Sequence, residues 1–184
     1  MVYISGGNEL INPEEILNRA GVKSGMKIAD LGCGGAGHFI IPAAHKVGSQ
    51  GMAYAVDILK SVLRSVISRA RLEGVNNVKL VWSNLEIPGA TKIPDQSLDV
   101  ALLINILFQS KQHENIIKEA QRLIQKQGKL VVIDWKPNAI ATFGPPPIDR
   151  TKPDKIKQIA QKLGLKLIEE FDAGTYHFGL IFEK

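Results

Sequence analysis

Polar side chains that could bind a ligand follow a series of short apolar runs in this sequence. Asp30, Asp57, Asn84, Asn105 and Asp134 each stand at or just past the end of a run with the composition of a β-strand. Ligands of open α/β sheets bind outside the carboxyl ends of the strands. The pattern therefore predicts one ligand-binding edge that is built from several strand ends.

The first of these ends is the most distinctive, because the acid opens the segment Asp30-Leu31-Gly32-Cys33-Gly34-Gly35-Ala36-Gly37. Glycine accepts positive φ angles and lets a ligand approach the backbone closely. A helix that starts after such a turn points its free N–H groups at that ligand. The pattern Gly32-x-Gly34-x-x-Gly37 also matches the dinucleotide fingerprint. The turn alone therefore fits a nicotinamide cofactor, another adenosine-bearing cofactor or a plain strand-to-helix turn.

Two acids around the turn narrow this choice. Asp57 ends the second strand-like run about 20 residues later, where an acid binds the ribose hydroxyls of adenosine. An acid in that place can also cap the next helix. Asp30 precedes the first glycine, where the strand of nicotinamide enzymes is normally apolar. It suits a ligand without a pyrophosphate and with a cationic amino-acid end.

These residues need a frame of alternating strands and helices. Strands are expected at residues 27–31, 52–57, 78–82, 98–104 and 129–135, and helices at 12–21, 36–47, 59–73, 113–125 and 153–163. Residues 83–97 and 136–151 carry prolines and are expected to be loops. The runs 165–172 and 176–183 predict an antiparallel hairpin. This alternation predicts a single α/β domain over residues 1–184, with helices on both faces of a parallel sheet.

The composition agrees with one globular domain of 184 residues, with 45% hydrophobic and 22% charged residues. The formal net charge of +5 comes from scattered bases, so we expect a mildly basic surface, while a nucleic-acid partner stays open. Cys33 is the single cysteine, which excludes an internal disulfide and a cysteine-based zinc site. We expect no metal, no signal peptide, no transmembrane segment and a cytoplasmic location.

Five motifs in order resemble the class I S-adenosylmethionine-dependent methyltransferases, especially the ubiquinone/menaquinone-type and type 11-like small single-domain group. They are VKSGMKIADLGCGGAG, GMAYAVDI, LVWSNLEIP, PDQSLDVALLINILFQ and EAQRLIQKQGKLVVIDW, within residues 12–136. The resemblance implies a doubly wound, Rossmann-like seven-stranded sheet in the order 3-2-1-4-5-7-6, with an antiparallel last strand. It also implies S-adenosyl-L-methionine as the methyl donor and S-adenosyl-L-homocysteine as the product.

The same resemblance implies a set of cofactor-binding residues. Asp57 would hold both ribose hydroxyls, and Asn84 would bind the adenine amino group in place of the usual aspartate. Ile104 and Asn105 would line the methionine end. The full set is Asp30, Gly32, Cys33, Gly34, Gly37, His38, Asp57, Ile58, Asn84, Leu85, Ile104 and Asn105. The Asn/Asp-Pro-Pro-aromatic motif of amino-directed methyltransferases is absent, because residues 105–108 read Asn-Ile-Leu-Phe.

Methyl transfer from a sulfonium mainly requires alignment and exclusion of water, since the donor is already activated. A general base is needed only when the acceptor starts protonated. Asp134 and His177 are the catalytic candidates at strand ends. Asp134 could instead cap a backbone or pair with Lys136, and His177 could be a half-buried strand residue. Trp135 and Arg150 are expected to rim the acceptor side.

The short chain carries no large insertion, which favours a small-molecule acceptor. The oligomeric state, monomer or homodimer, stays open. The alternatives are an RNA or protein methyltransferase, a cofactor-binding module without turnover and a nicotinamide-binding protein. Residues 1–25 form an N-terminal segment that could cover the pocket, with residues 3–12 as a lid.

Overall fold

The computed structural model describes residues 10–184 of the chain. The strands are β1 (Lys27–Leu31), β2 (Met52–Asp57), β3 (Val78–Trp82), β4 (Leu98–Ile104), β5 (Ile124–Trp135), β6 (Lys166–Asp172) and β7 (His177–Glu183). The helices are α1 (Pro13–Arg19), α2 (Ile40–Val47), α3 (Lys60–Leu72), α4 (His113–Leu123) and α5 (Pro153–Lys162), with short 3-10 helices η2 (Leu107–Gln109) and η3 (Pro147–Asp149). The expected lid lies mostly outside the described residues.

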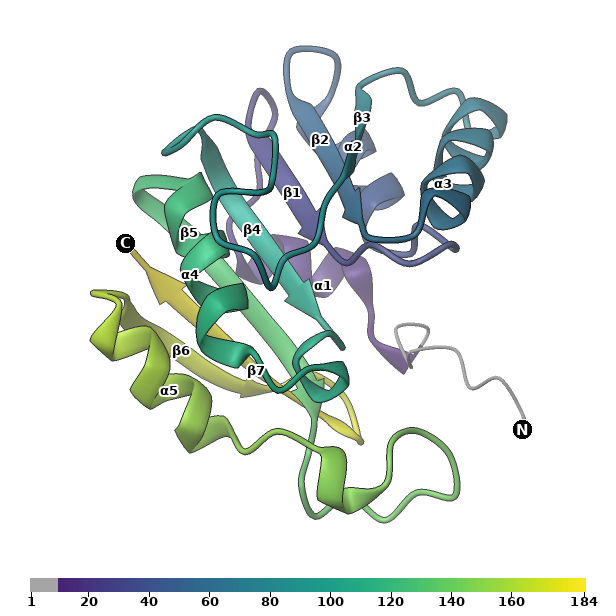
Figure 1. Cartoon of the computed structure of the whole chain (residues 1–184). Helices are drawn as coiled ribbons and strands as arrows, with labels where there is room; N and C mark the ends of the chain where they lie inside the picture. Colours follow the sequence, from purple (N-terminus) through teal and green to yellow (C-terminus); the bar gives the residue numbers. More distant parts are fainter. Residues whose placement is uncertain (1–9) are drawn as a thin grey trace.

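The strands form one sheet in the order β3-β2-β1-β4-β5-β7-β6, which confirms the order that the resemblance implies (Figure 1). β1 to β5 are parallel, and β7 pairs antiparallel with both β5 and β6. The chain adds β2 and β3 on one side of β1 and β4 onward on the other. The carboxyl end of β1 is therefore the switch point at which open α/β sheets bind ligands.

Helices cover both faces of the sheet. Residues two apart on a strand share a face, so alternate residues of the central strands belong to different cores. Ile28, Leu102 and Ile133 pack with α1, α2 and α3, whereas Leu103 and Val132 pack with α4 and α5. This two-sided burial explains why the central strands read as almost continuous apolar runs.

Two of the differences between the predicted and observed helix boundaries have a clear local cause, at the glycine turn and after α4. The helix expected from residue 36 starts at Ile40, because Gly34 and Gly37 both adopt φ of 61° and keep the turn non-helical. The helix expected to reach residue 125 ends at Leu123, since Ile124 already pairs with Leu98 of β4. β5 consequently begins earlier than residue 129.

The start of α1 follows the expectation closely. The Asn12 side chain accepts hydrogen bonds from the N–H groups of Glu14 (3.0 Å) and Glu15 (3.3 Å), and Pro13 occupies the first turn. An asparagine cap of this kind satisfies donors that the helix itself leaves free. The cap fixes where the chain enters the face of the sheet that α1 covers.

Candidate functional site

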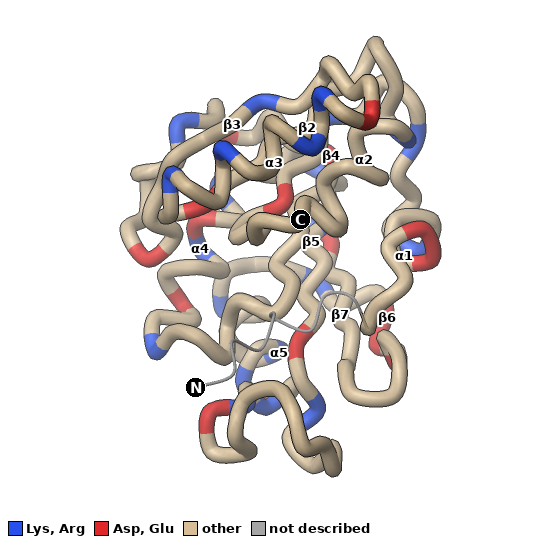
Figure 2. The backbone as a smooth tube through the Cα atoms, turned by 90° about the vertical axis from the view of Figure 1, so that its right-hand side faces the viewer, with Lys and Arg blue, Asp and Glu red and all other residues tan. Residues whose placement is uncertain are grey.

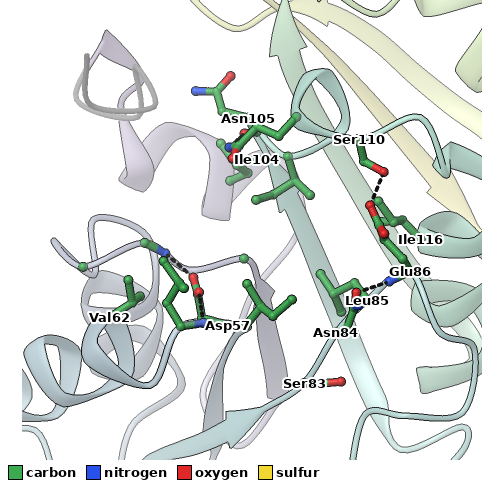
Figure 3. Close-up of a pocket in the computed structure, with 17 residues that line it drawn as sticks. Asp57, Val62, Ser83, Asn84, Leu85, Glu86, Ile104, Asn105, Ser110 and Ile116 are labelled. Carbon is green, nitrogen blue, oxygen red and sulfur yellow. Dashed lines mark hydrogen bonds between the residues drawn. The ribbon is translucent and has the colours of Figure 1, made fainter. Parts of the chain in front are cut away.

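A pocket of about 390 Å³ lies at the carboxyl ends of β1 to β4, at the switch point of the sheet (Figure 3). Its volume is within the range of small-molecule sites. Of the residues predicted to bind a cofactor, eight line this pocket: Gly32, Gly34, Asp57, Ile58, Asn84, Leu85, Ile104 and Asn105. The structure therefore brings together strand ends that are far apart in the sequence.

Four other residues of the predicted set do not line the pocket. The Cys33 side chain is buried in the core, on the face of the sheet that α2 covers. Gly37 connects the glycine turn to α2 through its backbone. The His38 Nε2 atom lies 3.0 Å from the Ile11 carbonyl oxygen. Asp30 lies in β1, two residues before Gly32, and is 2% exposed.

Asp57 connects the end of β2 to the glycine turn. Its Oδ2 accepts a hydrogen bond from the Gly34 N–H (3.3 Å), and its Oδ1 accepts one from the Leu59 N–H (2.9 Å), at the start of α3. Asp57 therefore caps the start of α3 and lines the pocket at the same time. A carboxylate has about four lone-pair sites, so it retains acceptor capacity toward a ligand.

The glycine turn depends on glycine for two separate reasons. Gly32 and Gly34 have φ of 89° and 61°, in the left-handed region that favours glycine. A Cβ atom on Gly32 would also lie 2.1 Å from the Ile106 side chain, whereas a Cβ on Gly34 would meet nothing within 4 Å. Ile106 therefore packs over the turn and closes one side of the pocket.

Asp30 carries a buried carboxyl oxygen, Oδ2, without a hydrogen-bond partner among the described residues. Burial raises the pKa of Asp30 to about 7, and the negative charge of Asp57 adds to the rise. Orphaned buried polar atoms are rare in folded proteins and point to a missing ligand or water. A cationic group bound beside the turn would supply the compensation that the chain lacks.

The loop over residues 83–97 holds Asn84 at the pocket. The Asn84 Oδ1 accepts the Glu86 N–H (2.9 Å), and the Ser110 hydroxyl donates to Glu86 (2.5 Å). The hydroxyl oxygen of Ser83, directly before Asn84, lies 3.0 Å from the hydroxyl oxygen of Thr91. The loop is thus fixed at both sides of the residue that was predicted to contact adenine.

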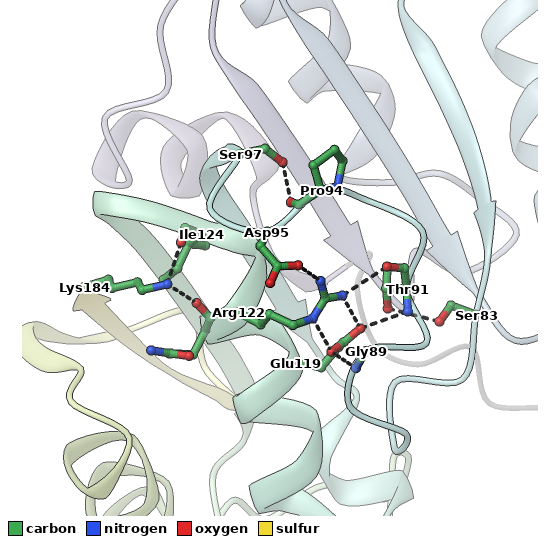
Figure 4. A network of polar contacts seen from close by, with 11 residues as sticks. Ser83, Gly89, Thr91, Pro94, Asp95, Ser97, Glu119, Arg122, Ile124 and Lys184 are labelled. Carbon is green, nitrogen blue, oxygen red and sulfur yellow. Dashed lines mark hydrogen bonds and ion pairs between the residues drawn. The ribbon is translucent and has the colours of Figure 1, made fainter.

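A buried ion pair that the sequence reasoning missed anchors this loop from α4 (Figure 4). The Glu119 carboxylate accepts the N–H groups of Gly89 (2.6 Å) and Thr91 (2.9 Å), and Arg122 donates to it at 2.7 and 2.9 Å. Arg122 also binds Asp95. Burial alone would raise the pKa of Glu119, but the bonds from Arg122, Gly89 and Thr91 lower it to about 2. The sequence feature that could have revealed this ion pair is Glu119 itself, a glutamate on the apolar face of the helix predicted at residues 113–125.

Asp134 is fully buried and serves the backbone. Its Oδ2 accepts the Phe108 N–H (3.0 Å) and its Oδ1 accepts the Trp135 N–H (2.8 Å). Burial raises the pKa of Asp134 to about 7, although these hydrogen bonds oppose the rise. It does not line the pocket, and Lys136 pairs with Asp172 (2.7 Å) rather than with Asp134. The geometry matches the capping alternative.

His177 is also fully buried, at the start of β7 beside Trp135. The two ring centroids are 4.4 Å apart, and neither imidazole nitrogen has a hydrogen-bond partner in the described part of the chain. Burial and the charge of Lys136 lower the pKa of His177 to about 4. The ring is therefore neutral at physiological pH.

Among residues 10–184, no group of three or more His, Cys, Asp or Glu side chains could hold a metal ion. Within the same residues, no helix is both long and apolar enough to span a bilayer.

The fold and the pocket define a class of protein: an open α/β sheet with an antiparallel β7, a glycine turn after β1 and an acid after β2. This is the architecture of class I S-adenosylmethionine-dependent methyltransferases. A family model described as a methyltransferase domain matches residues 22–172, and the chain belongs to this family. The methyl donor that the family implies is S-adenosylmethionine.

Individual relatives are distant. The demethylmenaquinone methyltransferase of Geobacillus kaustophilus (strain HTA426) is 27% identical over 122 residues, which are 66% of this chain and 50% of that protein. Aklanonic acid methyltransferase DauC of Streptomyces sp. (strain C5) is 34% identical over 79 residues, 43% of this chain and 34% of that protein. The chain thus spans half or less of the length of these curated relatives.

Solved structures match nearly the whole chain. One of them, the crystal structure of a SAM-dependent methyltransferase from Aquifex aeolicus, has a TM-score of 0.85 and 25% identity, over 96% of this chain and 92% of that chain. The similarity thus includes the hairpin of β6 and β7.

Proposed function

We propose that this chain transfers a methyl group from S-adenosylmethionine to a small-molecule acceptor by direct displacement. The observation that carries the proposal is the pocket at the switch point, where Asp57 joins the glycine turn beside Asn84 and Ile104. When bound, the cofactor supplies an already activated methyl group, so the chain needs to orient two ligands and exclude water.

The residues in the pocket fit this cofactor chemically. Asp57 offers free carboxylate lone pairs to the ribose hydroxyls, and Asn84, which also lines the pocket, would bind adenine. Ile104 and Asn105 line the same pocket and would contact the methionine end. The orphaned Asp30 oxygen matches the cationic amino-acid end of the cofactor, because a buried carboxylate needs an opposite charge.

A small acceptor is favoured over a macromolecule. The relatives named above act, by their names, on demethylmenaquinone and aklanonic acid. In the described part of the chain, Lys and Arg are spread over several elements with acids between them (Figure 2). Nucleic-acid binding by phosphate contacts relies instead on a concentrated basic surface.

Calorimetry with S-adenosylhomocysteine, S-adenosylmethionine and NAD tests the proposal. Both sulfur ligands should bind and NAD should not. The absence of binding by either sulfur ligand would overturn the proposal, and tight NAD binding would favour the dinucleotide alternative. Salt-dependent RNA binding that competes with methyl transfer to small acceptors would favour the macromolecular alternative.

A further inference from the structure

Trp135 and His177 together present buried polar atoms that nothing in the described chain satisfies. The Trp135 Nε1 and both His177 nitrogens lack a hydrogen-bond partner, and both side chains are 0% exposed. A buried polar group of this kind is unfavourable unless it meets a partner. Two orphaned side chains in direct ring contact, at 4.4 Å, form a candidate binding site outside the residues that line the cofactor pocket.

The register of the sheet places this pair next to the cofactor pocket. Ile104, which lines the pocket, pairs with Ile133 on β5, and Trp135 is the next residue of β5 on the same face. Trp135 in turn pairs with His177 on β7. One two-residue step of a strand is about 6.6 Å, so the pair lies just beyond the pocket wall. Asp134 points to the opposite face and binds Phe108 there.

The surroundings of the pair select against a charged ligand. Arg150 and Lys136, the cations that lie against it, are already bound to backbone carbonyls, and Lys136 also to Asp172. The Trp135 ring also contacts the aromatic rings of Phe143 and Tyr176. A charge placed here without a partner would be strongly unfavourable.

The hydrogen-bonding types also define the ligand. The Trp135 Nε1–H is a donor only, and a neutral imidazole offers one acceptor nitrogen. A single hydroxyl group can accept from the first and donate to the second, which a carbonyl or an ether cannot do. Aromatic walls favour a ring compound, because rings gain from edge and offset contacts.

We propose that Trp135 and His177 bind the hydroxyl group of an uncharged, phenol-like acceptor. The inference rests on the proposed function, since it assigns a place to the second substrate of that reaction. Both side chains are covered, so the ligand enters when the loop over residues 136–152 moves. In that loop, Phe143 packs on Trp135, and Gly144 comes so close that a Cβ would lie 2.5 Å from the indole.

The chain itself offers a fluorescent reporter for the test. It contains two tryptophans, and Trp82 is 59% exposed, so Trp82→Phe leaves the buried Trp135 as the single indole. We would titrate this variant with phenol, anisole and benzoate, with and without saturating S-adenosylhomocysteine. Phenol should change the Trp135 emission with saturation, while anisole and benzoate should bind at least about tenfold more weakly.

His177→Phe in the same background should weaken phenol binding by about tenfold and leave the affinity for S-adenosylhomocysteine unchanged. Equal binding of phenol and anisole, or no saturable response to phenol, would overturn the inference even if the histidine variant failed to fold. Binding of S-adenosylhomocysteine, measured in the same samples, tests the proposed function separately. Loss of that binding with phenol binding retained would overturn the function and not the phenol site.

Discussion

The Asp57 carboxylate accepts a hydrogen bond from the Gly34 backbone N–H at 3.3 Å, and this contact joins the end of β2 to the turn after β1. The two segments bring different chemistry to one place. The turn brings a backbone that a ligand can approach, and Asp57 brings an acceptor for hydroxyl groups. Neither segment would form a nucleoside site alone.

Replacement of the acid should therefore affect the cofactor directly. Asp57→Ala should weaken S-adenosylhomocysteine binding by about 1–3 kcal/mol, because the ribose loses charge-assisted hydrogen bonds. Calorimetry measures the change. Asp154→Ala, which removes a carboxylate with an 83% exposed side chain on α5, is the matched control and should bind normally. Equal affinity of Asp57→Ala and wild type would remove Asp57 from the site.

The two glycines of the turn should respond differently to alanine. Gly34→Ala adds a Cβ in open space, so it should cost about 1–2 kcal/mol of stability from the positive φ alone. Gly32→Ala has the same backbone cost and also collides with Ile106, so it should be more destabilising. Adding Ile106→Ala should recover only this second part. Denaturant unfolding of the single and double variants measures both, and a purely additive result would contradict the collision.

Glu119 should control both the acid stability and the loop that carries Asn84. Its pKa is lowered from 4.5 to about 2 in the folded chain, so its contribution to stability is present above about pH 4.5. That contribution should be lost as the pH falls through about 2. Glu119→Gln should lower stability at pH 7 by about 3–5 kcal/mol, because Arg122 loses its buried partner. Acid and denaturant unfolding followed by circular dichroism test this.

The same variant has a second readout at the pocket. At temperatures where it stays folded, Glu119→Gln should weaken S-adenosylhomocysteine binding, since the amide keeps one acceptor oxygen and only one of Gly89 and Thr91 stays bound. Glu114→Gln, on the exposed side of the same helix, is the control. Unchanged binding in a folded Glu119→Gln protein would show that the loop holds its position without the ion pair.

In the ligand-free protein, Asp30 should make the stability depend on pH in the direction opposite to that of Glu119. Its folded pKa of about 7 is above the ordinary 3.8, so the folded state binds the proton more tightly. The associated stability is fully present below about pH 3.8 and is lost as the pH rises through 7. Asp134, raised to about 7 by burial, contributes in the same direction. Asp30→Asn should therefore flatten part of this dependence in thermal unfolding.

The pH dependence of cofactor binding tests whether the Asp30 carboxyl contacts the cationic group of the ligand. If its amino group meets Asp30, the affinity for S-adenosylhomocysteine should rise between pH 6 and 8 in the wild type, as about one proton leaves Asp30. The rise should be smaller in Asp30→Asn. An equal rise in both proteins would place the cationic group elsewhere.

Local sequence determined much of this protein. Apolar runs located the strands, Asn12 and Pro13 located the start of α1, and the glycine pattern with Asp57 indicated a nucleoside-type ligand. These features succeed because capping, positive φ and burial on both faces act over a few residues. The strand order could not be predicted from local sequence. The alternation of strands and helices predicted a parallel sheet, whereas the order of its strands came from the family resemblance.

Tertiary structure alone decided how equivalent-looking residues differ. Asp30, Asp57 and Asp134 all follow apolar runs, yet one is orphaned, one lines the pocket and one caps a buried backbone. Their roles depend on neighbours from other strands, which local sequence does not specify. The same reason hid the bond between Glu119 and the loop, and the contact of Trp135 with His177. Pairing across the sheet, not spacing along the chain, determines which polar groups meet a partner and which still need a ligand.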